Sequence, residues 1–266
     1  MRRLANNLRI FWQSAVLSYV ALFRWLRPQT YLASKVAMPL WQMLFFTFIG
    51  TYGSGSSNAS FFVIGNAIQI TAVSGIFGVT MSVGGDRNEG TLVYLFGTPA
   101  NRLTMFVGRA LIHIIDGMLG VAIALTWGVL LLGLDLSHTD WPALTFTILI
   151  TTFSTAGLGL LLGCLSLVTL NVMLINNTVY FLLLIFSGAN VPISIMPGWM
   201  QAISQALPLT RGIAASRVLI AGGQLSQVAP LLVGEFLLGL VYISVGYAMF
   251  RWFEFQAKRR GTLEAF

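Results

Sequence analysis

Six long apolar segments limit what this chain can fold into. They cover residues 36–52, 61–83, 110–134, 143–168, 172–191 and 228–250. A helix needs about 20 apolar residues to cross a hydrocarbon core roughly 30 Å thick, and most of the segments reach that length. Membrane barrels would instead show alternating segments of about ten residues, which this sequence lacks. The pattern therefore predicts an all-α integral membrane protein with six transmembrane helices.

The composition excludes an ordinary water-soluble surface. Hydrophobic residues make up 56% of the 266 residues and charged residues only 9%, whereas soluble domains carry about 25% charged residues. The net charge of +7 does not indicate nucleic-acid binding, because the basic residues gather at the chain ends and in a few loops. The single cysteine, Cys164, lies in an apolar segment, so one chain offers neither a disulfide framework nor a thiol-ligated metal site.

The basic residues also predict the orientation, because cytoplasmic loops are enriched in lysine and arginine. All but two of the 15 basic residues lie before the first span, between the second and third spans, or after the sixth. Only Arg211 and Arg217 fall on the other side. Both termini are therefore predicted to be cytoplasmic, and this requires an even number of spans, which six satisfies.

Two parts of the chain differ from the spans. Residues 1–35 are expected to form an N-terminal amphipathic helix, with Phe11 and Trp12 on its apolar face and Arg9 opposite. This pattern favours a helix in the lipid headgroup plane, and a helix that faces a partner protein is a compatible alternative. Within the six-span domain, residues 36–266, prolines and glycines interrupt the segment 192–227. That segment predicts two short helices on, or re-entering, the outer leaflet.

No catalytic or metal-binding residues are expected. The sequence contains neither G-x-S-x-G nor H-E-x-x-H, and it has no G-x-x-x-x-G-K-[ST] loop for a nucleotide phosphate. His113 and His138 fall on opposite sides of the membrane in the predicted topology, so they cannot share a metal ion.

Arg109, His113 and Asp116 have the i, i+4, i+7 spacing of one helix face at the start of the third span. They are candidates for a polar gate near the cytoplasmic entrance. A structural ion pair between helices is the favoured alternative, because charges inside membranes usually pair. No acid is placed near the midplane, where ion-coupled carriers bind their ions, and this argues against a stand-alone carrier.

Uncharged polar residues inside the spans suggest a path for a cargo. The candidates are Asn66 and Gln69 in the second span and Asn176, Asn177 and Tyr180 in the fifth. Hydrogen bonds between helices, worth about 0.6–2 kcal/mol each, explain the same residues equally well. The sequence does not separate these two interpretations.

The connection between the second and third spans, residues 84–109, is longer and more charged than a simple turn requires. It contains "EGTLVYLF", which can form a short helix, and then Thr98-Pro99, after which Asn101 can cap a new helix. A rigid charged element of this kind could transmit the motion of a soluble partner protein to the spans. An ordinary folded loop is the alternative.

Two motifs resemble the type-two ABC exporter permeases. "DRNEGTLVYLFGTPANRLTMFVGR" is similar to the first cytoplasmic loop of that family. "FSGANVPISIMPGWMQAISQALPLTRGIAASR" resembles the family's outer signature before the last span, with Pro208, Arg211 and Arg217 at signature positions. Together with the six spans, the resemblance extends over nearly the whole chain.

The resemblance implies a permease half that forms a homodimer and pairs with two copies of a separate ABC ATPase subunit. ATP and Mg would bind to that partner, and this chain would need no cofactor. By motif position, the resemblance implies a coupling role for Glu89, Gly90, Thr91, Pro99 and Arg102. It also implies export of a drug-like compound, lipid or glycolipid from a bacterium through its plasma membrane. A stand-alone carrier or channel, and an intramembrane enzyme that acts on lipids, are the competing hypotheses.

Overall fold

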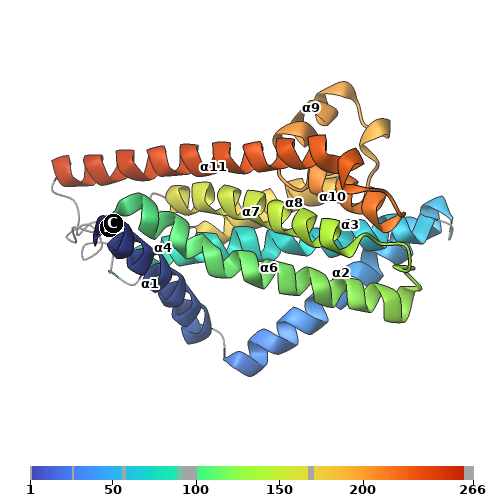
Figure 1. Cartoon of the computed structure of the whole chain (residues 1–266), viewed down its shortest axis with the longest axis horizontal. Helices are drawn as coiled ribbons and strands as arrows, with labels where there is room; N and C mark the ends of the chain where they lie inside the picture. Colours follow the sequence, from blue (N-terminus) through green and yellow to red (C-terminus); the bar gives the residue numbers. More distant parts are fainter. Residues whose placement is uncertain are drawn as a thin grey trace.

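Every element that the computed structural model describes is a helix (Figure 1). The structure describes residues 2–25, 27–55, 58–88, 90, 101–166 and 171–260. The α-helices are α1 (Arg2–Trp25), α2 (Pro28–Ser54), α3 (Ala59–Ala72), α4 (Val79–Asn88), α6 (Arg102–Leu132), α7 (Trp141–Ser166), α8 (Val172–Phe186), α9 (Gly198–Ala206), α10 (Thr210–Ile220) and α11 (Leu225–Arg260). A π-helix, η2 (Val73–Gly78), joins α3 to α4, and a 3-10 turn, η3 (Ile193–Ile195), precedes α9. The predicted all-α class is confirmed.

Five helical stretches are long and apolar enough to cross a membrane: Pro28–Gly53, Ala59–Gly84, Leu103–Leu132, Trp141–Ser166 and Leu225–Gln256. The chain is therefore a multi-pass membrane protein. The predicted fifth span, residues 172–191, corresponds to the shorter apolar helix α8, which has 15 residues. This helix ends at Phe186, and Gly188 follows with a left-handed φ of 79°. The sixth crossing remains a prediction.

The first membrane helix begins earlier than the sequence indicated. Pro28 stands in the first turn of α2, where a residue without a backbone N–H is tolerated. The helix then continues through Pro39 to Ser54. Lys35, expected before the first span, therefore lies two turns inside α2.

The start of α1 and the end of α11 lie at one end of the bundle, and α9 and α10 lie toward the other (Figure 1). The long α1 packs along α6 and buries Ser14, Ala15 and Ser18. Leu8 and Trp12 remain exposed on its outer side. An apolar outer side fits a helix that contacts lipid headgroups and acyl chains.

Helix α7 forms the centre of the bundle, where it contacts α11, α4, η2, α6 and α10. Small residues allow this close packing, and Gly159 and Gly163 have the G-x-x-x-G spacing that is common where membrane helices cross closely. A Cβ atom at Gly159 would collide with the backbone carbonyl oxygen of Gly75 in η2, and one at Gly163 would lie 2.8 Å from Cβ of Val83. The crossing of α7 with the α3–η2–α4 helix therefore depends on glycine.

Candidate functional site

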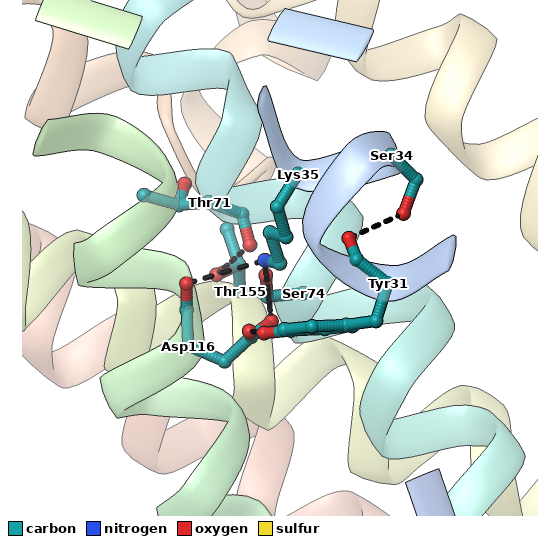
Figure 2. Close-up of polar contacts among 7 residues, drawn as sticks. All are labelled: Tyr31, Ser34, Lys35, Thr71, Ser74, Asp116 and Thr155. Atoms are coloured by element: carbon teal, nitrogen blue, oxygen red, sulfur yellow. Dashed lines mark hydrogen bonds and ion pairs between the residues drawn. The ribbon is translucent and has the colours of Figure 1, made fainter. Parts of the chain in front are cut away.

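A buried charged cluster joins α2, η2 and α6 (Figure 2). Nζ of Lys35 lies 2.5 Å from Oδ2 of Asp116 and 2.8 Å from Oγ of Ser74. The Ser74 hydroxyl donates to the same carboxylate oxygen at 2.6 Å, and the Tyr31 hydroxyl donates to Oδ1 of Asp116. Nζ also donates to the backbone carbonyl of Asp116 at 3.2 Å. Both charges are therefore neutralised and hydrogen-bonded inside the bundle.

The elements around this pair explain why it can form there. A charge inside a membrane costs several kcal/mol unless it is paired, so neither residue is tolerable alone. Ser74 lies in the first turn of η2, and π-helical turns are frequent at functional sites. Gly120, one turn beyond Asp116, lets α6 pack closely on α3, because a Cβ there would lie 2.8 Å from Cγ2 of Ile70.

The three predicted gate residues do lie on one face of α6, against the α3–η2–α4 helix. Asp116 meets Ser74, His113 packs against Gly78, and Nη1 of Arg109 donates to the backbone carbonyl of Ser82 at 2.7 Å.

His113 is 1% exposed, and both of its ring nitrogens lack a hydrogen-bond partner among the described residues. Asp116 forms the inter-helix ion pair that the alternative interpretation expected. Its partner, Lys35, was missed because the sequence placed that residue outside the first span.

A second group of polar side chains lies between α2, α3 and the end of α8. The Tyr180 hydroxyl donates to Oε1 of Gln42 at 2.7 Å, and Nε2 of Gln42 lies 3.4 Å from Oδ1 of Asn66. Nδ2 of Asn66 donates to Oδ1 of Asn190 at 2.8 Å. We call these four residues the amide seam. Close to it, the Ser187 hydroxyl donates to Oε1 of Gln69 at 3.2 Å.

The seam includes some of the predicted path residues and not others. Asn66 and Tyr180 belong to it, and Gln69 lies beside it. Asn176 is fully buried one turn before Tyr180, and its amide atoms have no hydrogen-bond partner among the described residues. Asn177 is exposed on the outer side of α8. Sequence reasoning missed Gln42, although it is the one carboxamide in the apolar segment 36–52.

Two of the three predicted outer-signature residues, Pro208 and Arg211, lie at a joint between the start of α10 and α11, and the third, Arg217, lies near the end of α10. Leu209, before the first residue of α10, has a φ of 81°, which is rare for a residue other than glycine. Its backbone N–H donates to Oε1 of Glu235 at 2.9 Å. Pro208 is buried, and the Arg211 side chain runs along Gly234, where a Cβ would lie 3.0 Å from Cδ of the arginine. Glu235 therefore holds the start of α10 against α11.

This joint predicts different stabilities for two variants at one position. Glu235→Ala should lower the free energy of unfolding by about 1–2 kcal/mol, because it leaves the buried N–H of Leu209 without an acceptor. Glu235→Gln keeps an acceptor oxygen and should lose less. The measurement is the midpoint of detergent-induced unfolding in mixed micelles. Equal midpoints for the two variants would show that this hydrogen bond does not hold the joint.

The predicted coupling residues fall mainly outside the described residues. Glu89, Thr91 and Pro99 are not among them, and Gly90 stands in a turn with a φ of 68°. Arg102 is the first residue of α6. The side chain of Asn101 caps this helix by accepting the backbone N–H of Thr104 at 3.3 Å, which confirms the predicted cap.

The flanking helices nevertheless show how the loop is attached. Helix α4 extends to Asn88 and α6 begins at Arg102, so both helices run past the predicted span ends at residues 83 and 110. Asp116 lies on the same helix that leaves this loop. The start of α6 and the ion pair with Lys35 are therefore joined by one continuous helix.

Comparison with known families places the chain. A family model described as ABC-2 type transporter matches residues 13–221. The matched region runs from α1 to the end of α10, and it includes both the motif between the second and third spans and the outer signature. A comparison with curated proteins gave no match.

Proposed function

The chain belongs to the ABC-2 type transporter family, and from this premise we propose that it is the permease subunit of an ATP-driven exporter. Family membership makes it an ABC permease subunit, and the direction of transport is part of the proposal. Two copies of a separate ABC ATPase would bind ATP and Mg, since this sequence has no phosphate-binding loop. Two copies of this chain would complete the exporter in the plasma membrane.

The amide seam is the observation that best supports an amphipathic cargo. It places carboxamide and hydroxyl groups, which carry no charge, inside an apolar helical bundle. Sites for small molecules are mostly apolar and contain a few well-placed polar groups. A drug-like compound, lipid or glycolipid has this combination of hydrocarbon and neutral polar atoms. We propose that such a cargo enters from the cytoplasm or the inner leaflet and passes the seam on its way out.

In this proposal, the loop between α4 and α6 binds the ATPase subunit. ATP binding would close the ATPase pair, and the loop would pass that closure to α6 as a rigid-body displacement. The helix α6 supports this route because it is continuous from Arg102 to Leu132 and contains Asp116. The proposed coupling residue Arg102 and the proposed gate residue Asp116 therefore lie on the same helix.

The test compares ATP hydrolysis by the complex of this chain with its candidate ATPase. Glu89→Ala and Arg102→Ala should lower cargo-stimulated hydrolysis about fivefold or more, because coupling between sites is typically worth 5–150-fold. Asp135→Ala is the matched control, because it also removes a charged side chain, from the exposed connection between α6 and α7. This variant should behave as the wild type.

Two results would count against the proposal. Transport by the purified chain without any ATPase would favour the stand-alone carrier or channel. Normal binding and normal stimulation in both loop variants would remove the coupling role from these residues, even if the ATPase partner is correct.

A further inference from the structure

An arginine near the end of α10 has an unusual environment. Nη2 of Arg217 donates to the backbone carbonyl oxygens of Phe61 at 2.9 Å and Ala189 at 3.1 Å. The guanidinium carbon also lies 3.6 Å from the centre of the Phe61 ring, a cation–π contact. Gly65 permits this approach, because a Cβ there would lie 2.7 Å from Nη2. The side chain is thus held firmly between α3 and the segment after α8.

Most of the guanidinium's hydrogen-bonding capacity is unused. An arginine carries five N–H donors, and both hydrogen bonds of the Arg217 side chain to the described residues come from Nη2. Nε is buried and has no partner among those residues. Nη1 likewise makes no hydrogen bond within the part of the chain that the structure describes. The residue as a whole is half-buried.

The acids nearest to this end of the bundle are engaged elsewhere. The chain has 8 acidic residues, and those near α10 are Asp135, Asp140 and Glu235. Oδ1 of Asp135 accepts the backbone N–H of Ser137 at 2.9 Å, which lowers the pKa of this carboxyl. Oδ1 of Asp140 accepts the N–H of Ala143, and Glu235 accepts that of Leu209.

No described carboxylate forms an ion pair with Arg217. Backbone carbonyls solvate a guanidinium but do not cancel its charge, and a half-buried charge without a counter-ion is unfavourable. The described part of the chain therefore leaves this charge open to an external counter-ion.

We propose that Arg217, stacked on Phe61, binds the anionic headgroup of an amphiphile at the outer side of the membrane. Both hydrogens of Nη2 are donated to carbonyls, so Nη1 is the group left to donate to a phosphate or carboxylate oxygen. Hydrogen bonds to ionised acceptors are the strong ones, and the weakly hydrated guanidinium suits a partly desolvated site. The surroundings suit an amphiphile rather than a free ion, because Val218, the next residue of α10, is an exposed apolar side chain. A membrane lipid and a departing cargo are two sources of the same headgroup chemistry.

The first experiment uses the purified chain alone, exchanged into micelles with equal amounts of phosphatidylglycerol and phosphatidylcholine that have identical acyl chains. Retained lipids are counted by native mass spectrometry. The wild type should retain phosphatidylglycerol about tenfold better, as expected from the strength of charge-assisted hydrogen bonds. Arg217→Gln should retain both lipids equally. Arg211→Gln removes the same charge from the neighbouring signature position and should keep the preference.

A second measurement does not depend on the folding of the glutamine variant. A photoreactive phosphatidylglycerol analogue should label the wild-type chain within residues 58–66 or 210–220. Arg217→Lys, which keeps the charge but not the planar guanidinium stacked on Phe61, should show weaker labelling at the same place. Equal retention of the two lipids by the wild type, unchanged preference in Arg217→Gln, or labelling confined to other segments would overturn the proposal.

The source of the headgroup is decided in vesicles that also contain the ATPase partner. A resident lipid would change the rate of ATP hydrolysis without being moved. A cargo would show ATP-dependent movement of fluorescent phosphatidylglycerol between leaflets, lost in Arg217→Gln. Only this last comparison rests on the proposed export function. The retention and labelling tests do not depend on export. Failure of the headgroup proposal can therefore be distinguished from failure of the export proposal.

Discussion

Asp116→Ala is expected to lower the free energy of unfolding by about 3–5 kcal/mol, because it leaves the Lys35 ammonium group buried without its counter-charge. It also removes the acceptor for the hydroxyl groups of Ser74 and Tyr31. The midpoint of detergent-induced unfolding in mixed micelles measures the loss. An unchanged midpoint would show that the ion pair does not form in the membrane.

The double variant Lys35→Met/Asp116→Leu is the matched control. Replacing both members of a buried ion pair with apolar residues of similar size is often neutral or stabilising, so most of the lost stability should return. This variant also separates the two interpretations of the gate residues. If it is stable and transports normally, the pair is structural. If it is stable but ATP hydrolysis no longer drives transport, the pair takes part in gating.

Gly159→Leu should cost about 3 kcal/mol or more, the upper end of what overpacking a core costs. Even a Cβ atom at this position collides with the backbone carbonyl oxygen of Gly75, and a backbone atom cannot rotate away as a side chain can. The helix α7 would have to separate from η2. Unfolding midpoints and the yield of folded protein measure the effect.

Gly53→Leu provides the comparison for this substitution. Gly53 lies near the end of α2, and a Cβ there meets nothing within 4 Å. The same change in side chain should therefore be neutral or slightly stabilising, because glycine is unfavourable within a helix by about 0.5–1 kcal/mol. If both leucine variants lose stability equally, close packing of α7 on η2 is not the cause.

The lengths of the apolar segments and the distribution of charge are enough to determine the class of this protein. The all-α membrane class follows from them because backbone hydrogen bonds inside a bilayer must be satisfied within each helix. Local signals were equally informative: Asn101 caps α6 as its position predicted, and the spacing of Arg109, His113 and Asp116 placed them on one face. The two motifs indicated the family that the family model then matched.

Helix ends were less predictable, because hydropathy is a weak guide where a helix leaves the apolar region. Helix α2 begins at Pro28 rather than near residue 36, and α8 is shorter than its segment of 172–191. Both differences involve proline or glycine, whose effect depends on the backbone around them: Pro28 starts a helix and Pro39 does not stop one.

Only the tertiary structure decided which polar residues meet. Lys35 and Asp116 are 81 residues apart, and nothing in their local sequence names one as the partner of the other. The same holds for Gln42 with Tyr180, for Glu235 with the N–H of Leu209, and for Arg217 with two carbonyls and no described acid. The composition and periodicity of a helix determine that it forms and which side is apolar. Its rotation and depth against its neighbours are set by packing over the whole bundle, and those determine the partners.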